Sequence, residues 1–278
     1  PRKDETIRDL NGVIGAPPSL DKWRLYDLFQ TYNTDPYAVT TAAQQRQSRP
    51  YRIDHALAPQ GATQDRPRLR LVERERGGDA GRATVIPYVR RWGGSVAAFI
   101  LSHPHADHAG GAATVVRALR PAVFWDGAYV GTSDTYRTAL SAVEAAGITW
   151  ERARPGARTI IDDVELEFLA PDSAWTRALD DPNEASVVLR ARYGAVRFLL
   201  VGDAEREEER WLLARDSLAL RAEVLKVGHH GSTTSTTDPF LRAVRPVIAL
   251  VSVGVGNSYG HPSPRVLALL AGNGATVL

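Results

Sequence analysis

Histidine placement is the sequence feature that most constrains what this 278-residue chain can fold into. Six of its seven histidines lie in three short segments, each of which follows a predicted apolar strand or is flanked by glycine: His103, His105 and His108; His229 and His230; and His261. Loops at strand ends are where a rigid scaffold presents reactive groups. The seventh, His55, stands alone in a polar region and is predicted to be a surface residue. The three segments therefore define the candidate site.

The chain contains no Cys, which excludes disulfide frameworks, thiolate zinc sites, Cys nucleophiles and Cys-ligated iron–sulfur clusters. Any metal must be held by His, Asp or Glu. The 34 Lys and Arg against 32 Asp and Glu leave a net charge of +2, which excludes a histone-like tail and a strong overall attraction to nucleic acid. A local basic patch is still possible. Five basic residues either line a path for a phosphate or are simply solvated: Arg90, Arg91, Arg117, Arg120 and Lys226.

Residues 1–66 and 67–278 differ in character, which predicts two parts. The first part is polar, and within it only Asp21–Tyr32 has the periodicity of a short amphipathic helix. We expect residues 1–66 to form a poorly ordered or atypical N-terminal arm. No apolar run approaches the length needed to span a bilayer, and no signal peptide is visible. The start at Pro1 and the lack of Met indicate processing or an excised fragment.

From about residue 69 the pattern is α/β, with strands and helices alternating along the chain. Alternation at Val164–Leu169 is typical of a half-buried strand, and Tyr193-Gly194-Ala195 predicts the turn of a hairpin. Further predicted strands are 69–72, 96–101, 186–192, 196–201, 223–227 and 247–253. Predicted helices are 87–92, 112–119, 133–146, 206–214, 239–244 and 263–271. Two successive halves of this kind favour two packed sheets with helices outside.

The first histidine segment, Ser102–Gly111, carries four potential ligands within six residues. His103 and His105 can point toward one ion while Asp107 and His108 turn toward a second. The alternative is a hydrogen-bonded polar loop, which is the default for a single His. That alternative explains an H-x-H-x-D-H pattern after a strand poorly.

Three further positions complete the candidate set. Asp203 follows the predicted strand 196–201 and suits a ligand that bridges two ions, although an Asp at a strand end is, on its own, more often a helix cap. His229 and His230 are adjacent and point in different directions, so that one can ligate while the other donates to a substrate oxygen. A solvent-facing pair is the alternative for these two. His261 lies between Gly and Pro in a segment that is also typical of a surface turn.

Read in order, these segments resemble the metallo-β-lactamase superfamily. The sequences that carry the resemblance are FILSHPHADHAGG, FLLVGDAE, VLKVGHHGSTTS and NSYGHPSPRVLALL. The last two point more narrowly to the soluble domain of ComEC-type competence proteins, which internalise DNA, and the resemblance covers about residues 69–278. It implies an α/β (α+β) fold, namely an αββα sandwich over residues 67–278 with a dinuclear site at the strand ends.

The resemblance also implies roles for individual residues. The expected metal ligands are His103 and His105 on one ion, Asp107 and His108 on the other, Asp203 as the bridge, and His229. Either member of the 229/230 pair fits that last position. Catalytic roles are expected for Asp107, His230 and His261, and substrate contacts for Lys226 and Ser232. The two divalent ions are expected to be zinc or manganese, because the ligands are nitrogen and oxygen.

Two features depart from the family pattern. Asn183–Ser186 occupies the stretch where lactamases carry their third His motif, which argues against β-lactam hydrolysis. The Asp-x-Gly-Gln-Gly-Asp loop that opens ComEC-like domains has no copy here, and only Asp79-Ala80-Gly81 resembles the turn that follows it. The sequence therefore predicts a sandwich that lacks its first strands and leaves a sheet edge unpaired.

The implied function is metal-dependent hydrolysis of a phosphodiester, with single-stranded DNA as the substrate. A dinuclear site makes hydroxide available near neutral pH and holds the phosphoryl group during in-line attack. Asp107 or Asp203 orients the nucleophile, and His230 or His261 protonates the leaving oxygen. Two alternatives stay open: a hydrolase of lactones, thioesters or phosphorylcholine esters, and an inactive truncated copy. A free-standing protein is expected in the cytoplasm, and a detached part of a membrane DNA-uptake system outside it.

Overall fold

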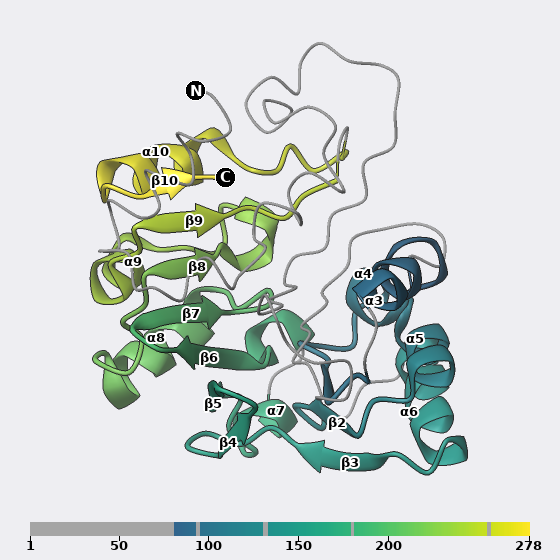
Figure 1. Ribbon diagram of the computed structural model, residues 1–278. Coiled ribbons are helices and arrows are strands. Elements are labelled where there is room, and N and C mark those ends of the chain that lie inside the picture. The colour runs from purple at the N-terminus through teal and green to yellow at the C-terminus, as the bar shows by residue number, and fades with distance from the viewer. Residues whose placement is uncertain (1–80, 93–94, 130–132, 179–180, 255–256) are drawn as a thin grey trace.

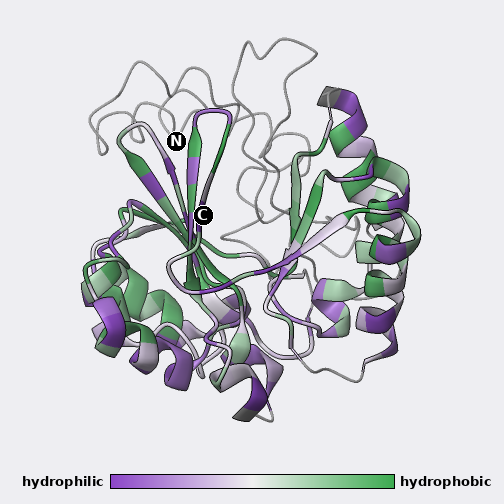
Figure 2. Ribbon diagram, turned by 90° about the horizontal axis from the view of Figure 1, so that it is seen from below, coloured by the Kyte–Doolittle hydropathy of each residue, from purple (hydrophilic) through white to green (hydrophobic). Residues whose placement is uncertain are grey.

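The computed structural model describes residues 81–92, 95–129, 133–178, 181–254 and 257–278. The expectations for the arm at 1–66, for His55, for the strand at 69–72 and for Asp79-Ala80 lie outside these residues, as does the expected lack of first strands. Within the described residues, two β-sheets pack face to face and helices cover both outer faces (Figure 1, Figure 2). These four layers confirm the predicted αββα sandwich.

The smaller sheet carries the first histidine segment. Its parallel strands lie in the order β1 (Ala98–Ile100), β2 (Val123–Asp126) and β3 (Thr149–Arg152). The chain reaches β1 through η2 (Gly81–Val85) and α3 (Ile86–Trp92). Three helices then connect the strands, namely α4 (Ala106–Ala109), α5 (Ala112–Leu119) and α6 (Asp134–Ala145).

Local signals set the ends of these helices. The Ser133 side chain caps α6 by accepting a hydrogen bond from the backbone N–H of Tyr136 at 3.2 Å, as predicted. Helix α5 ends at Arg120, which has a φ of +44°. The Arg120 guanidinium donates to the Ala146 carbonyl at 2.7 Å and so joins the ends of α5 and α6. The other basic residues considered for a phosphate path on this side of the fold are exposed: Arg90, Arg91 and Arg117.

The larger sheet contributes the other histidine segments. Among the described residues it has seven strands in the order β10-β9-β8-β7-β6-β5-β4. In chain order they are β4 (Arg158–Ile161), β5 (Val164–Ala170), β6 (Val188–Tyr193), β7 (Val196–Leu200), β8 (Val224–Lys226), β9 (Ile248–Leu250) and β10 (Thr276–Val277). The helical segments between them are α7 (Trp175–Ala178), η3 (Pro182–Ala185), α8 (Arg206–Asp216), η4 (Gly228–Gly231), α9 (Asp238–Val244) and α10 (Pro264–Gly272).

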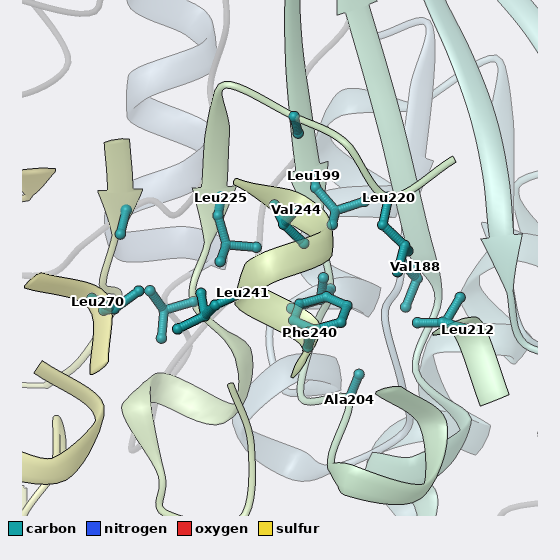
Figure 3. Packing of buried hydrophobic residues seen from close by; sticks show 14 of the residues in the cluster. Val188, Leu199, Ala204, Leu212, Leu220, Leu225, Phe240, Leu241, Val244 and Leu270 are labelled. Carbon is teal, nitrogen blue, oxygen red and sulfur yellow. The ribbon is translucent and has the colours of Figure 1, made fainter. Parts of the chain in front are cut away.

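Apolar side chains fill the space between the layers. Between the sheets, Trp125 of β2 packs against Phe168 of β5 with ring centroids 5.6 Å apart. On the outer face of the larger sheet, Leu225 of β8 meets Phe240 and Leu241 of α9 (Figure 3). Burial of this kind stabilises a fold by roughly 1.5–3 kcal/mol for each large apolar side chain. This packing fixes how the two sheets lie against each other.

The ends of the central strands meet at one edge of the sandwich. Strands β7, β8 and β9 are parallel, so their carboxyl ends lie together. The backbone N–H of Val187, just before β6, donates to the Ser102 carbonyl just after β1 at 2.8 Å. This hydrogen bond ties the two sheets together where both histidine-bearing loops leave their strands.

Candidate metal centre

The loop after β1 gathers three histidine rings and one carboxylate. Its backbone is extended at His105, where α4 begins, and the helical turn carries Asp107 and His108. Nε2 of His103 lies 3.1 Å from Nδ1 of His105. The Ser102 hydroxyl lies 3.2 Å from Nδ1 of His103 and 3.1 Å from Nδ1 of His108, so it orients both rings. His103 and His108 are buried, whereas His105 and Asp107 are partly exposed.

Asp203 lies at the centre of the histidines. Its Oδ2 is 3.2 Å from Nε2 of His108 and 3.3 Å from Nε2 of His230. The same oxygen is 3.8 Å from Nε2 of His229 and 4.0 Å from Nε2 of His103. Helix α8 has Glu205 as its N-cap residue, so the alternative role of Asp203 as a helix cap is excluded. One carboxylate oxygen therefore faces four imidazoles that come from both sheets.

The backbone at Gly202 makes this position of Asp203 possible. Gly202 has a φ of +54°, and a Cβ placed there would lie 2.9 Å from both the Ser102 Cβ and the Ser186 Oγ. Only glycine accommodates that close approach without displacing its neighbours. The Ser186 hydroxyl in turn accepts the backbone N–H of Asp203 at 3.0 Å. Two loops that are distant in sequence thus hold Asp203 in place.

Lys226 lies beneath the carboxylate. Its side chain is fully buried, and its ammonium donates to the Gly202 carbonyl at 2.8 Å and lies 3.5 Å from Oδ1 of Asp203. Burial alone raises the pKa of Asp203, but the positive charges of His108, His230 and Lys226 hold it well below its usual range. Asp203 is therefore ionised wherever the protein is folded near neutral pH.

The two adjacent histidines of η4 point in different directions, as the sequence indicated. Both have left-handed backbones, with φ of +43° at His229 and +54° at His230. The buried His230 turns toward the cluster, where its Nε2 lies 3.2 Å from Nε2 of His108 and 3.8 Å from Oδ2 of Asp107. The half-buried His229 turns toward Glu205, whose Oε1 lies 2.7 Å from its Nδ1.

The remaining predicted residues lie around this centre. The Ser232 hydroxyl is buried and lies 2.8 Å from the Thr234 hydroxyl, which in turn donates to Glu205 at 2.7 Å. The His261 ring lies beside His229, with centroids 5.9 Å apart. The loops of His229 and His261 approach each other closely at Gly231, where a Cβ would lie 2.6 Å from the Cβ of Pro262. Ser232 and His261 therefore flank the cluster on the side of His229.

The donor atoms of the cluster fit a divalent cation. One ligand atom each from Asp107, His108, Asp203 and His230 lies within 4.8 Å of the others. The Ser252 carbonyl lies 3.0 Å from Nδ1 of His230 and can only accept, so Nδ1 carries a hydrogen; when the ring gives up its second proton on binding a cation, the lone pair is on Nε2. That lone pair faces a carboxylate oxygen, an arrangement that is stable only with a cation or a proton between the two atoms.

Burial supports the same conclusion. Oδ1 of Asp203 is buried and accepts no hydrogen bond among the residues that the structure describes. A buried carboxylate oxygen without a hydrogen bond is costly even beside the ammonium of Lys226, and a bound cation lowers that cost. His103 and His105 extend the donor set on one side of Asp203. Nitrogen and oxygen donors without sulfur suit zinc or manganese.

Several residues that support the site were not singled out from the sequence. Glu205 orients His229, and the Ser252 carbonyl orients His230. Glu205 follows Asp203 by two residues, and a second acid so close to a strand end is a usable signal. The stretch Asn183–Ser186 also has a structural role, because the Glu184 carboxylate accepts the backbone N–H groups of Glu207 and Glu208 at 3.1 and 2.8 Å. It thereby anchors the start of α8.

Comparison with curated proteins finds relatives that include a recombination protein and competence proteins. Recombination protein 2 of Haemophilus influenzae is 34% identical over 195 residues, which are 70% of this chain and 22% of that protein. ComE operon protein 3 of Bacillus subtilis is 31% identical over 204 residues, which are 71% of this chain and 25% of that protein. Competence protein ComA of Neisseria gonorrhoeae is 33% identical over 179 residues, 64% of this chain and 23% of that protein. The chain thus spans about a quarter of the length of these relatives.

One solved structure supports the same fold. A mutant of CmlA beta-hydroxylase superposes with a TM-score of 0.53 at 10% identity, over 84% of this chain and 52% of that chain. None of the helices in the described part of the chain combines the length and apolar character that crossing a membrane requires.

The family model described as the metallo-beta-lactamase superfamily matches residues 61–255, which include both strand-end loops that meet at Asp203. The chain therefore belongs to the metallo-β-lactamase superfamily, with a metallohydrolase fold and relatives among the competence proteins.

Proposed function

We propose that this protein is a metal-dependent phosphodiesterase that cleaves single-stranded DNA. The observation that carries the proposal is the position of Asp203, one buried carboxylate faced by four histidines from loops of both sheets. Its relatives include a recombination protein and a competence protein, which supports DNA as the substrate. We further propose that residues 67–278 form the working domain, and that it serves a membrane DNA-uptake system.

We assign two divalent ions, zinc or manganese, to the cluster. His103 and His105 would hold one ion, Asp107 and His108 the other, and Asp203 both. His230 would complete the set in preference to His229, since it is buried and its Nε2 lies 3.3 Å from Oδ2 of Asp203 against 3.8 Å for His229. When bound, such ions lower the pKa of water and stabilise the charge on a phosphoryl group.

Hydrolysis joins a water oxygen to phosphorus, breaks the bond to the leaving oxygen, and transfers one proton from the water to that oxygen. Asp107 is suited to orient the water, because its side chain is 34% exposed and its Oδ2 lies 3.7 Å from Nε2 of His108. His261 is suited to donate the proton to the leaving oxygen, because it lies at the partly exposed side of the cluster beside His229.

Two predicted substrate contacts receive different assignments. We assign Lys226 to positioning Asp203, because its ammonium is fully buried and lies 3.5 Å from Oδ1 of that residue. Ser232 is assigned to holding the loop of His229, because its hydroxyl accepts the backbone N–H of Thr234 at 3.3 Å. Contact with the phosphate then falls to the partly exposed His229 and His261 and to the ions.

The test combines metal analysis with cleavage of a labelled single-stranded oligonucleotide in zinc and in manganese. We expect about two ions per chain, and we expect Asp203→Asn and His230→Ala to lose both metal and cleavage. Asp134→Asn is the matched control, since that carboxylate lies on α6 and is 94% exposed. Metal binding with hydrolysis of lactones or thioesters and no cleavage of DNA would replace the proposal by the ester hydrolase. Absence of metal from the wild-type protein would indicate an inactive copy.

A further inference from the structure

A row of three aromatic rings leads from the surface to the metal centre. Tyr259 is 63% exposed and stacks on His261 with centroids 5.7 Å apart and planes 18° from parallel. His261 packs edge-on against His229 at 5.9 Å. Nε2 of His229 lies 3.8 Å from Oδ2 of Asp203. The exposed ring at the end of this row is therefore separated from the central carboxylate by only two histidines.

The exposure of Tyr259 is unusual within the described part of the chain. Large apolar side chains left exposed there are few: Trp150, Ile160, Leu218 and Tyr259. Ile160 lies on the edge strand β4, and Leu218 follows α8. Tyr259 alone among them stacks on a ring that contacts the histidines around Asp203. An exposed aromatic ring beside a reactive centre is a common means of holding a flat ligand.

The turn that carries Tyr259 is held in one conformation by Asn257. The Asn257 side-chain oxygen accepts the backbone N–H groups of Tyr259 at 3.1 Å and His261 at 3.0 Å. Its amide nitrogen donates to the carbonyls of Gly254 at 3.1 Å and His261 at 2.7 Å. Four hydrogen bonds from one side chain therefore present the two rings as a rigid pair. Such preorganisation lowers the conformational entropy that ligand binding costs.

We propose that Tyr259, supported by His261, is a stacking platform for an unpaired nucleobase next to the scissile phosphate. This inference rests on the proposed phosphodiesterase function and specifies its substrate as a single-stranded polynucleotide. Every base offers a flat π face, so a platform of this kind tolerates any sequence, and a base held in a duplex cannot reach it. The phosphate joined to that nucleoside is then directed toward His229 and Asp203.

A binding experiment tests the platform without requiring cleavage. The probes are a fluorescein-labelled thymidine oligonucleotide and an abasic strand of the same length and charge, titrated with the full chain. We expect the wild-type protein to favour the thymidine strand by about 5- to 150-fold, the range that stacking on one aromatic ring provides. Tyr259→Ala is expected to abolish this preference and Tyr259→Phe to keep it, because stacking needs the ring and not the hydroxyl. Ile160→Ala is the control for loss of an exposed apolar side chain, at 69% exposure.

A cleavage experiment separates this inference from the function on which it rests. The ratio of kcat/KM for a thymidine nitrophenyl phosphodiester to that for methyl nitrophenyl phosphate, which has the same leaving group and a methyl group in place of the nucleoside, is expected to fall by about 5- to 150-fold in Tyr259→Ala. The loss is expected as a rise in KM with kcat unchanged, since the platform binds the base and does not touch the phosphorus. An unchanged ratio, or an unchanged strand preference in the binding titration, overturns the inference while leaving the phosphodiesterase intact. A wild-type protein that hydrolyses neither diester instead overturns the proposed function.

Discussion

Replacing Lys226 by methionine tests the charge balance beneath the metal centre. The ammonium is fully buried, 2.8 Å from the Gly202 carbonyl and 3.5 Å from Oδ1 of Asp203. Two unit charges at that separation attract each other by about 5 kcal/mol when the effective dielectric constant is near 20. Removing one partner of a buried ion pair has a typical net cost of about 3–5 kcal/mol when the other is left uncompensated. His108 and His230 still face Asp203 in the variant, so we expect Lys226→Met to lower the free energy of unfolding of the metal-free protein by less, about 2–3 kcal/mol.

The assay is urea unfolding in the presence of a chelator, followed by the fluorescence of the six tryptophans. Asp203→Asn and the double variant complete a mutant cycle. The double variant is expected to lose less stability than Lys226→Met alone, because no uncompensated charge is then buried. A loss below about 1 kcal/mol for Lys226→Met, or additive losses in the double variant, would show that Lys226 does not balance Asp203.

Three further predictions concern the scaffold. Gly202→Ala should lower the free energy of unfolding by about 2–4 kcal/mol, and Gly147→Ala by only about 1 kcal/mol. Both glycines have a positive φ, but only at Gly202 would a Cβ lie against other atoms. Thermal unfolding of the two variants therefore separates backbone strain from steric clash. Leu225→Ala should lower the free energy of unfolding by about 2–5 kcal/mol and Leu218→Ala by less than about 0.5 kcal/mol, since the first side chain is fully buried and the second is 84% exposed. Equal unfolding midpoints for the two variants would contradict the core described above. Burial raises the pKa of Glu209 from 4.5 to about 7, so its contribution to stability is present below pH 4.5 and is lost as the pH rises to 7. Glu209→Gln should therefore reduce the pH dependence of the unfolding midpoint between pH 4.5 and 7. An unchanged slope would show that Glu209 does not titrate there.

Much of the architecture follows from local signals. The cap at Ser133 and the helix stop before Pro121 lie where the sequence predicts them, because capping depends on residues within one turn. The bounds of the strands are less well predicted from the sequence than those of the helices. The apolar run at 96–101 is a strand only over Ala98–Ile100, since hydrogen bonding to a neighbour and not apolar character sets a strand's ends. The exposed edge strands β3 and β4 carry little apolar signal and were not predicted.

By itself, the sequence determined the chemistry available to this protein: nitrogen and oxygen ligands in three segments at strand ends, and the family to which those segments belong. It left open which of two adjacent histidines turns toward the carboxylate. Only the tertiary structure decided that, because the partners that orient them, Glu205 for His229 and the Ser252 carbonyl for His230, are supplied by other loops. The same holds for Lys226, whose burial under Asp203 depends on the pairing of β7 with β8. Residue types are a local property of a chain, whereas the direction in which a side chain points is set by contacts between distant segments.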